Sequence, residues 1–189
     1  VYKRQQPMTT LDWTRLDSPV GPLLLMADGD TLLACEFDSK ADRIGALKAR
    51  LERALGAHEL REHPDPAGAV GRLQRYFGGD VRALEGQPVR LLGTPFQDIV
   101  WRALLDIPVG QTRSYGQLAA TLGAPEASRA VGAANGANPI ALFVPCHRVI
   151  AADGTLHGYG GGLDRKAWLL KHEGARFAGC DPAPQLELK

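Results

Sequence analysis

The sequence predicts an α+β fold: a small N-terminal α/β unit with a short antiparallel sheet, followed by a mainly helical, winged-helix-like domain with a helix-turn-helix. Two observations support this prediction. Strand-length apolar runs around a hairpin signal fill the segment before residue 40, and helix-start signals and glycine breaks alternate after Gly93. We therefore expect an N-terminal domain over residues 1–92, a second domain over residues 93–176 and a tail over residues 177–189.

The composition is typical of a soluble globular protein, with 189 residues of which 44% are hydrophobic and 23% are charged. No segment has the apolar length of a membrane span, and no secretory signal is recognisable, so we expect a cytoplasmic protein. Residues 1–7 precede a natural-looking start at Met8 and are interpreted as an extension. The formal net charge of +1 does not by itself indicate a nucleic-acid partner.

The N-terminal unit shows strand and helix patterns but no pattern that indicates a reaction. Apolar runs at residues 23–26 and 31–35 lie on either side of Asp28-Gly29-Asp30, which predicts a β-hairpin. Residues 41–55 carry apolar side chains at helical spacing and end at a glycine, and a second helix is expected over residues 67–77.

Two capping-box sequences mark the first helices of the C-terminal domain. Thr94-Pro95-Phe96-Gln97 places proline at the first helical position and predicts a helix that runs to about Asp106. Ser114-Tyr115-Gly116-Gln117 predicts a short helix that ends near Gly123, and a further helix is expected to begin near Glu126. Helix, glycine turn and helix is the arrangement of helix-turn-helix DNA-binding domains, although many such pairs only pack on each other.

The segment from residue 127 to residue 152 contains no Asp or Glu, and its only full charges are Arg129 and Arg148. Its helix consists almost entirely of small residues, so it can approach a polyanion closely. Arg129 could then pair with a phosphate or enter the base stack. The alternative is a helix of small residues that packs tightly against a neighbouring element.

A cysteine and a histidine stand side by side at Cys146-His147. The apolar run at residues 140–144 precedes them, and we expect it to be a buried strand that ends where the thiol enters a loop. Only the thiolate is strongly nucleophilic, so a neighbouring base or positive charge decides whether the cysteine reacts. A buried, inert cysteine is the alternative.

Several motifs occur in the order found in the O6-alkylguanine-DNA alkyltransferases, and the chain resembles the bacterial constitutive type of that family. The matching motifs are Ser128-Arg129-Ala130-Val131-Gly132, Asn138-Pro139, Pro145-Cys146-His147-Arg148-Val149-Ile150, residues 158–163 and residues 166–174. The resemblance is strong from residue 93 to residue 174 and only general in the N-terminal unit. It implies DNA repair in which the alkyl group of O6-alkylguanine moves irreversibly to the protein, one group per molecule, without a cofactor. Activity on O4-alkylthymine is left open.

The resemblance also implies the chemical roles of five residues. Cys146 would accept the alkyl group, His147 would remove the thiol proton through a water, and Glu173 would orient and charge that histidine. Tyr115 would donate its phenol proton to the guanine ring. Asn138 would tie the DNA-contacting helix to the strand that precedes the thiol.

The remaining implied contacts are with duplex DNA and with the flipped base. Arg129 would replace the extruded nucleotide in the stack, because an enzyme that acts on O6 inside a duplex must flip the base out. Further DNA contacts are expected from Ser114, Ala130, Ala133 and Ala134, and contacts with the guanine from Val149, Tyr159 and Gly160. Gly160 offers only its backbone where some relatives carry a hydroxyl, and His157 stands where a small residue is common. Tolerance of bulky adducts therefore stays open.

Three other functions are weighed against this one: a Cys-His hydrolase, a lesion-binding protein without chemistry, and a transcriptional sensor. The presence of Cys146 argues against the second, and too few cysteines remain for the zinc-cysteine module of the third. No metal site is expected, because His58 and His63 lack cysteine partners nearby and Cys35 cannot hold zinc alone. Cys180 stands apart from the other two cysteines, so no disulfide framework is expected. We expect a monomer that needs no membrane and no protein partner.

Overall fold

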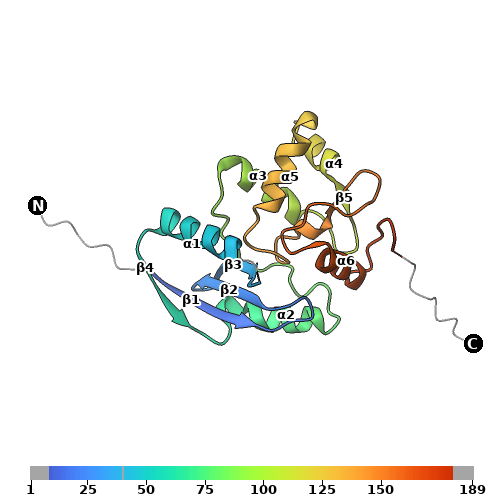
Figure 1. Cartoon of the computed structure of the whole chain (residues 1–189). Helices are drawn as coiled ribbons and strands as arrows, with labels where there is room; N and C mark the ends of the chain where they lie inside the picture. The colour runs from blue at the N-terminus through green and yellow to red at the C-terminus, as the bar shows by residue number, and fades with distance from the viewer. Residues whose placement is uncertain (1–8, 40, 181–189) are drawn as a thin grey trace, which may run out of the picture.

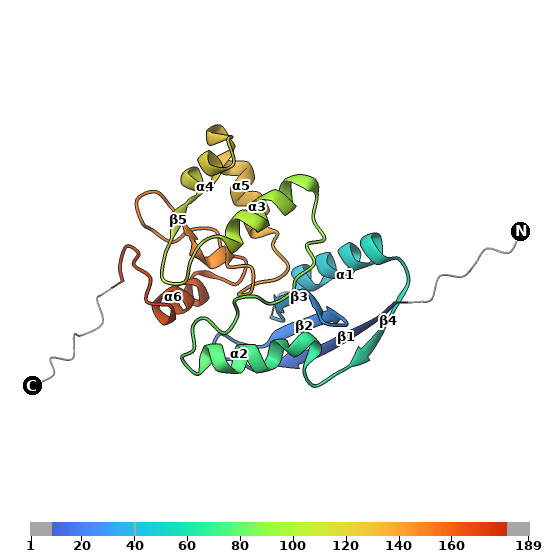
Figure 2. The same ribbon diagram turned by 180° about the vertical axis from the view of Figure 1, so that it is seen from behind.

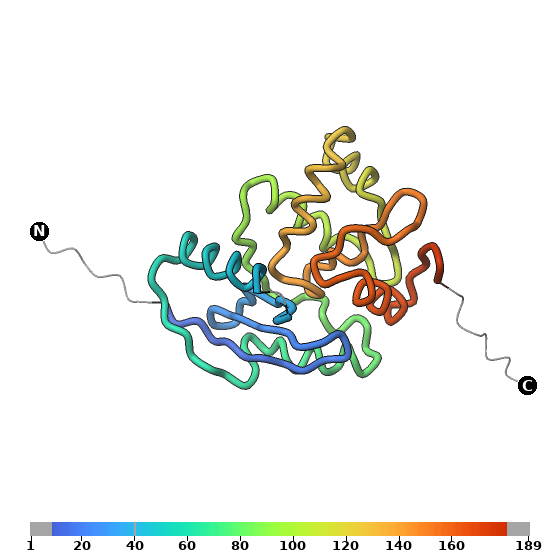
Figure 3. The backbone as a smooth tube through the Cα atoms, viewed as in Figure 1, coloured from blue at the N-terminus to red at the C-terminus, as the bar shows by residue number. Residues whose placement is uncertain are grey.

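A computed structural model describes residues 9–39 and 41–180, so the predicted extension at residues 1–7 and most of the predicted tail lie outside the described residues. An N-terminal unit with a sheet lies beside a helical C-terminal unit (Figures 1 and 3). The α+β fold class is confirmed, while the boundary at residues 92 and 93 stays a prediction. The strands are β1 (Thr9–Leu16), β2 (Leu23–Asp28), β3 (Thr31–Phe37), β4 (His58–Glu62), β5 (Arg113–Ser114) and β6 (Val149–Ile150). The α-helices are α1 (Ala41–Leu55), α2 (Ala69–Phe77), α3 (Pro95–Leu105), α4 (Tyr115–Thr121), α5 (Ser128–Gly136) and α6 (Leu163–His172).

The N-terminal sheet has the strand order β3-β2-β1-β4 and is mixed. Strand β2 pairs antiparallel with both β1 and β3, as the hairpin signal predicts, but β4 pairs parallel with β1. The prediction of a short antiparallel sheet thus holds for β1, β2 and β3, and the edge strand β4 makes the sheet mixed. Strand β4 has the sequence HELRE and is largely exposed, so it shows no apolar alternation that would mark it as a strand.

Helices α1 and α2 cover opposite faces of this sheet (Figures 1 and 2). Alternate residues of β2 point to the two faces of the sheet. Leu24 and Met26 belong to an apolar cluster with Leu47 and Leu51 of α1. Leu23 and Leu25 belong to the cluster that contains Leu73 and Tyr76 of α2. Because both faces are covered, β2 is apolar without interruption from residue 23 to residue 27.

The C-terminal unit contains the predicted helix-turn-helix. Both predicted capping boxes are present, with Thr94 capping α3 and Ser114 capping α4. The turn after α4 contains Gly123 in the left-handed conformation, with φ of 74°, which L side chains rarely adopt. Helix α5 packs on both α3 and α4, and Trp101 Nε1 of α3 donates to the carbonyl of Ala134 at 2.8 Å.

The apolar run at residues 140–144 is not the strand that its composition predicts. It is a turn in which Leu142 has φ of 68°, and Cys146–Arg148 then form one turn of 3₁₀-helix. The run is apolar because residues 140–144 pack into the core cluster that both units share. A buried turn and a buried strand both consist of apolar residues, so composition alone does not distinguish them.

A short backbone bridge joins this turn to the edge of the N-terminal sheet. The N–H of Cys35 in β3 donates to the carbonyl of Pro139 at 2.9 Å, and the N–H of Ala141 donates to the carbonyl of Cys35 at 2.8 Å. The two units therefore meet through main-chain hydrogen bonds a few residues before the Cys-His pair. Cys35 itself is buried in the sheet.

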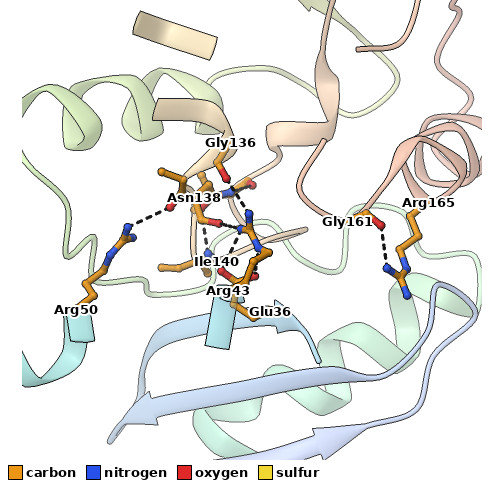
Figure 4. A network of polar contacts seen from close by, with 10 residues as sticks. Glu36, Arg43, Arg50, Gly136, Asn138, Ile140, Gly161 and Arg165 are labelled. Carbon is orange, nitrogen blue, oxygen red and sulfur yellow. Dashed lines mark hydrogen bonds and ion pairs between the residues drawn. The ribbon is translucent and has the colours of Figure 1, made fainter. Parts of the chain in front are cut away.

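Arg43 of α1 connects the N-terminal unit to the C-terminal end of α5 (Figure 4). Its Nε and Nη2 donate to the two carboxylate oxygens of Glu36 at 2.7 and 3.1 Å. Its Nη1 and Nη2 also donate to the carbonyls of Gly136 and Asn138, each at 2.8 Å. One guanidinium therefore satisfies a buried carboxylate and two carbonyls at the end of a helix.

Arg50, two turns further along α1, acts on the same helix end. Its Nη2 donates to the carbonyl of Ala137 at 3.2 Å, and its guanidinium lies 5.1 Å from the ring centroid of Trp101. Positive charge near the C-terminal end of a helix is favourable, because the helix dipole is negative there. The N-terminal unit thus supplies the cations that stabilise the end of α5.

We predict that Arg43→Met lowers the free energy of unfolding by about 3–5 kcal/mol, because it leaves a buried carboxylate without its ion-pair partner. Glu36 is only 3% exposed and so cannot turn to water for a substitute. Equilibrium unfolding in urea measures the change. Arg53→Met on the exposed face of the same helix is the control and should stay within about 0.5 kcal/mol of the wild type. Equal stability of the two variants would contradict the role assigned to Arg43.

Candidate functional site

Cys146, His147 and Glu173 lie together where the two units meet. Cys146 and His147 belong to the 3₁₀ turn, and Glu173 is the residue at the C-terminal end of α6. His147 Nε2 lies 2.9 Å from Glu173 Oε1, and both side chains are buried. The structure thus brings together the three residues that the Cys-His motif and the resemblance point to.

The thiol of Cys146 is 5% exposed, and burial raises its pKa above the ordinary value for a cysteine. A hydrogen bond with Asn138 and the positive charges of Arg43 and Lys166 act in the opposite direction without cancelling the effect of burial. The thiol therefore keeps its proton at neutral pH, and it needs a base before it can act as a nucleophile.

His147 is a neutral imidazole at neutral pH. Burial lowers its pKa, and the nearby carboxylate of Glu173 raises it by a smaller amount. Since Glu173 is ionised, Nε2 carries the proton and donates it to that carboxylate, which leaves Nδ1 as the basic nitrogen. Within the described residues, Nδ1 bonds to no protein group, so it can accept a proton.

Glu173 is also held by Arg148, whose importance the motif did not reveal. Arg148 Nε donates to Oε2 at 2.8 Å and Nη2 donates to Oε1 at 3.0 Å, while Nη1 donates to the carbonyl of Ile107 at 2.6 Å. Burial acts to raise the pKa of Glu173, but His147 and Arg148 more than offset it and hold that pKa far below the ordinary value. The carboxylate is therefore ionised at every physiological pH.

A second unforeseen partner of Glu173 comes from the N-terminal unit. The hydroxyl of Tyr76 in α2 donates to Oε1 at 2.9 Å. Tyr76 and Glu173 are separated by 97 residues, and no local pattern relates them.

Asn138 closes the turn that precedes the thiol. Its Nδ2 donates to the carbonyl of Val144 at 2.8 Å, and its Oδ1 accepts from the N–H of Ile140 at 3.0 Å. The 3₁₀ turn Cys146–Arg148 is called the thiol turn below. Asn135 of α5 bonds to it directly, since its Nδ2 donates to the carbonyl of Cys146 at 3.3 Å. Asn135 was not anticipated, because an asparagine inside a helix gives no sign of its distant partner.

An open pocket of about 410 Å³ lies on the helix-turn-helix side of the site. It is lined by Tyr115, Ser128, Arg129, Gly132, His157 and Gly158. The Tyr115 hydroxyl donates to the carbonyl of His157 at 3.2 Å. The pocket brings together Tyr115 and Arg129, two of the predicted site residues, whereas Cys146 is not part of its lining.

Lys166 of α6 lies beside this pocket and was also not anticipated. Its buried Nζ donates to the carbonyl of His157 at 2.7 Å and lies 5.9 Å from the ring centroid of Tyr115. Burial lowers the pKa of Lys166 to about 8, although the nearby Cys146 thiol acts to raise it. The site thus contains a cation that is held by a carbonyl rather than by a carboxylate.

The predicted DNA contacts on α5 separate into two groups. Arg129, Ala130 and Ala133 are exposed. Ala134 is 3% exposed and lies on the face of α5 that packs on Trp101, so its side chain does not reach the surface, and its contact with DNA stays a prediction. Helical periodicity explains the difference, because residue 134 shares its face with the buried residue 131. Ser114 is half-buried, and its hydroxyl accepts from the N–H of Gln117 as the cap of α4.

The residues expected to contact the guanine lie on both sides of the thiol turn. Val149 is fully buried in β6 and follows the turn directly. The ring of Tyr159 packs edge-on against Phe37 of β3, with centroids 5.9 Å apart, and its buried hydroxyl bonds to no group among the described residues. Tyr159 is therefore placed between the N-terminal sheet and the glycine loop, which consists of residues 160–162.

At Gly160 and Gly161 the glycine loop lies close to side chains of the N-terminal unit. A Cβ at Gly160 would come within 2.3 Å of Arg43 Nη1, and one at Gly161 would come within 2.5 Å of the Phe37 ring. Arg165 of α6 fixes the loop by donating from Nη1 to the carbonyl of Gly161 at 2.8 Å (Figure 4). The glycine run therefore serves close packing between the units.

Among residues 9–39 and 41–180, no group of three or more His, Cys, Asp and Glu side chains could hold a metal ion. No helix in the same ranges is long and apolar enough to cross a membrane.

Family models match almost the whole of the described chain. Residues 11–91 match the 6-O-methylguanine DNA methyltransferase, ribonuclease-like domain, and residues 95–175 match the 6-O-methylguanine DNA methyltransferase, DNA binding domain. The methylated-DNA–protein-cysteine methyltransferase of Salmonella typhimurium is 48% identical over 161 residues, which cover 85% of this chain and 94% of that protein. The protein of the same name from Mycobacterium bovis is 45% identical over 169 residues, with 88% and 94% covered.

Solved structures show the same similarity. The crystal structure of Mycobacterium tuberculosis OGT in complex with DNA superposes with a TM-score of 0.73 at 43% identity, covering 87% of this chain and 92% of that one. The O6-methylguanine-DNA methyltransferase of Pyrococcus kodakaraensis superposes with a TM-score of 0.61 at 26% identity, covering 87% and 99%.

We predict that Glu173→Gln lowers the free energy of unfolding by about 3–5 kcal/mol at neutral pH, because the buried Arg148 loses its ion-pair partner. The pKa of Glu173 is depressed in the folded protein, so its stabilising contribution is present above the pKa of the unfolded chain and is lost as the pH falls. The stability difference between wild type and variant should therefore shrink from about pH 5 downward. Urea unfolding across this range measures it, with the exposed Glu126→Gln as control. A difference that does not depend on pH would contradict the ionised state of Glu173.

Proposed function

Because this chain belongs to the 6-O-methylguanine DNA methyltransferase family, we propose that it transfers the alkyl group of O6-alkylguanine in duplex DNA irreversibly to its own Cys146. The observation that carries this proposal is the buried arrangement of one thiol, one neutral imidazole and one ionised carboxylate, Cys146, His147 and Glu173. The relatives named above are methylated-DNA–protein-cysteine methyltransferases, and a cysteine is the acceptor in that name.

The transfer is a direct displacement at the alkyl carbon. His147 Nδ1 takes the proton of Cys146 through a water, and the thiolate attacks the alkyl carbon as the bond to O6 breaks. The electron pair of that bond stays on the guanine, which gains a proton with the help of the Tyr115 phenol. Guanine thus gains the proton of Tyr115, and His147 returns the proton that came from the thiol to the Tyr115 phenolate through solvent, so both side chains regain their starting states. The protein carries a thioether with no hydrolytic exit. The same displacement applies to O4-alkylthymine, whose alkyl group is also on an exocyclic oxygen.

DNA would approach the exposed face of α5. The small side chains of Ala130 and Ala133 allow close contact with the DNA backbone, and Ser114 caps the start of α4, the helix that packs on α5. Arg129 takes the place of the flipped nucleotide, because the target oxygen is out of reach inside a paired duplex. The flipped guanine would enter between the helix pair and the thiol turn, where Val149, Tyr159 and Gly160 contact it.

The reaction needs one copy of this chain and no cofactor, since every group in the scheme comes from the same protein. We therefore propose a monomer that works in the cytoplasm, where Cys146 stays reduced.

We predict that incubation with duplex DNA carrying labelled O6-methylguanine moves at most one label to each protein molecule. Peptide mapping should find the added mass on the peptide that contains Cys146 and not on those that contain Cys35 or Cys180. Cys146→Ala should bind the DNA without taking up label. Repeated turnover by one molecule, or full transfer by Cys146→Ala, would overturn the proposed function.

We predict that Arg129→Ala slows transfer from duplex DNA by about tenfold or more, since extrusion of the base costs a few kcal/mol that an inserted side chain recovers. Transfer from a free O6-alkylguanine base should stay near the wild-type rate, because a free base needs no extrusion. Arg82→Ala, an exposed arginine of the N-terminal unit, is the control for lost positive charge. Equal losses on both substrates would show that Arg129 shapes the pocket instead.

A further inference from the structure

Tyr76 reaches the site from the other unit of the protein. It lies near the end of α2 and is fully buried, and its hydroxyl donates to Glu173 Oε1 at 2.9 Å. The same oxygen accepts from His147 Nε2 at 2.9 Å. The N-terminal unit therefore contacts the carboxylate that orients the base of the proposed reaction.

Two contacts fix Tyr76 at the end of α6. Its backbone carbonyl lies 2.7 Å from Nε2 of His172, the residue before Glu173. Its ring meets the His172 ring edge-on at 4.9 Å, and His172 in turn stacks on Trp168 at 4.8 Å. The hydroxyl and the carbonyl of one residue thus hold two consecutive residues of the C-terminal unit, so the position of the hydroxyl is well defined.

We propose that Tyr76 is a positioning residue for alkyl transfer: its hydroxyl holds the Glu173 carboxylate in place and takes up part of its negative charge, so that His147 remains a neutral base. The expected effect of Tyr76 on catalysis rests on the proposed function. Its expected effect on the protonation of His147 rests on the geometry alone.

The physical argument concerns how the charge on Oε1 is shared. That oxygen accepts hydrogen bonds from three donors: Tyr76, His147 and Arg148 Nη2, the last at 3.0 Å. Each donor that bonds to a carboxylate reduces the negative charge that remains to stabilise an imidazolium. Without the Tyr76 hydroxyl, more of the charge would act on His147 and its pKa would rise.

Burial and the other charged groups around His147 act on its pKa in both directions. Burial lowers its pKa most, Glu173 raises it, and the cations Arg148 and Lys166 lower it. Burial and the neighbouring Glu173 raise the pKa of Tyr76 far above the ordinary value for a tyrosine, so its hydroxyl always carries the proton that it donates. The Tyr76 hydroxyl therefore keeps its proton and donates the hydrogen bond to Glu173 at every pH at which transfer is measured.

The test compares Tyr76→Phe with the wild type, because this change removes the hydroxyl and leaves the ring. Transfer from a free O6-alkylguanine base is measured from pH 5.5 to pH 9. The acid limb of the rate profile should move to higher pH by about half a unit to one unit, the effect of one hydrogen bond. Affinity for duplex DNA should stay unchanged.

Phe77→Leu is the matched control, since Phe77 packs on Tyr76 and His172 but has no group that could bond to Glu173. It should lower the melting temperature without moving the acid limb. An acid limb that stays in place in Tyr76→Phe, with only a lower melting temperature, would overturn the proposal and leave Tyr76 a purely structural residue.

A second measurement needs no alkyl transfer. The His147 ring is titrated by NMR in wild type and in Tyr76→Phe, with its signal assigned by comparison with His147→Gln. A higher pKa of His147 in Tyr76→Phe supports the proposal, and an unchanged or lower pKa overturns it. If the wild type transfers no alkyl group, the proposed function fails while this comparison still decides the role of Tyr76.

A tyrosine analogue provides a second test in case Tyr76→Phe folds poorly. Replacing Tyr76 with 3-fluorotyrosine keeps the ring and makes the hydroxyl a stronger donor, so the pKa of His147 should fall. Shifts of opposite sign for the two replacements support the proposal. Shifts of the same sign, or no shift with the analogue, overturn it.

Discussion

The rest of the structure depends on the buried carboxylate of Glu173. A charge removed from water is tolerated in a protein interior only when donors surround it. Here three parts of the fold meet: the turn at Cys146–Arg148 supplies the donors His147 and Arg148, α2 of the N-terminal unit supplies the donor Tyr76, and the C-terminal end of α6 supplies the carboxylate itself. Loss of any of these donors would destabilise the buried charge. The carboxylate therefore fixes the two units and the thiol turn relative to one another.

The N-terminal unit carries no nucleophile for the proposed reaction, yet it contacts α5, the turn before the thiol, the glycine loop and Glu173. Arg43 and Arg50 bond to three consecutive carbonyls at the end of α5, and Cys35 bonds through its backbone to the turn before the thiol. Phe37 and Arg43 lie so close to Gly161 and Gly160 that a Cβ at either position would require one of them to shift. Through these contacts the N-terminal unit fixes the positions of α5, the thiol turn and the glycine loop relative to one another.

The parts of the fold that could be predicted are those with local causes. Both capping boxes and the Cys-His pair depend on residues within a few positions of each other, and the structure has them as the sequence indicates. Strand β4 was missed because its side chains are polar and exposed, so only backbone pairing with β1 makes it a strand. The apolar turn at residues 140–144 was mistaken for a strand because burial, and not strand pairing, selects its composition. The partners of Glu173 and of α5 could not be predicted, since Tyr76 and Arg43 are about ninety residues from the groups that they bond.

Burial shifts the two reacting groups of the site in opposite directions, and this decides how the site can work. It raises the pKa of the Cys146 thiol and lowers the pKa of the His147 imidazole, so proton transfer between them is uphill in the resting protein. A resting thiol of this kind is slow to react with oxidants or stray electrophiles, because the thiolate is scarce. The groups that favour the charged pair are already in place: Asn138, Arg43 and Lys166 stabilise a thiolate, and Glu173 stabilises an imidazolium. In the proposed reaction, formation of the carbon–sulfur bond consumes the thiolate as it forms, which draws the unfavourable proton transfer forward. The proposed thioether product restores neither the thiol nor its proton, so the proposed reaction is a single irreversible transfer rather than repeated turnover.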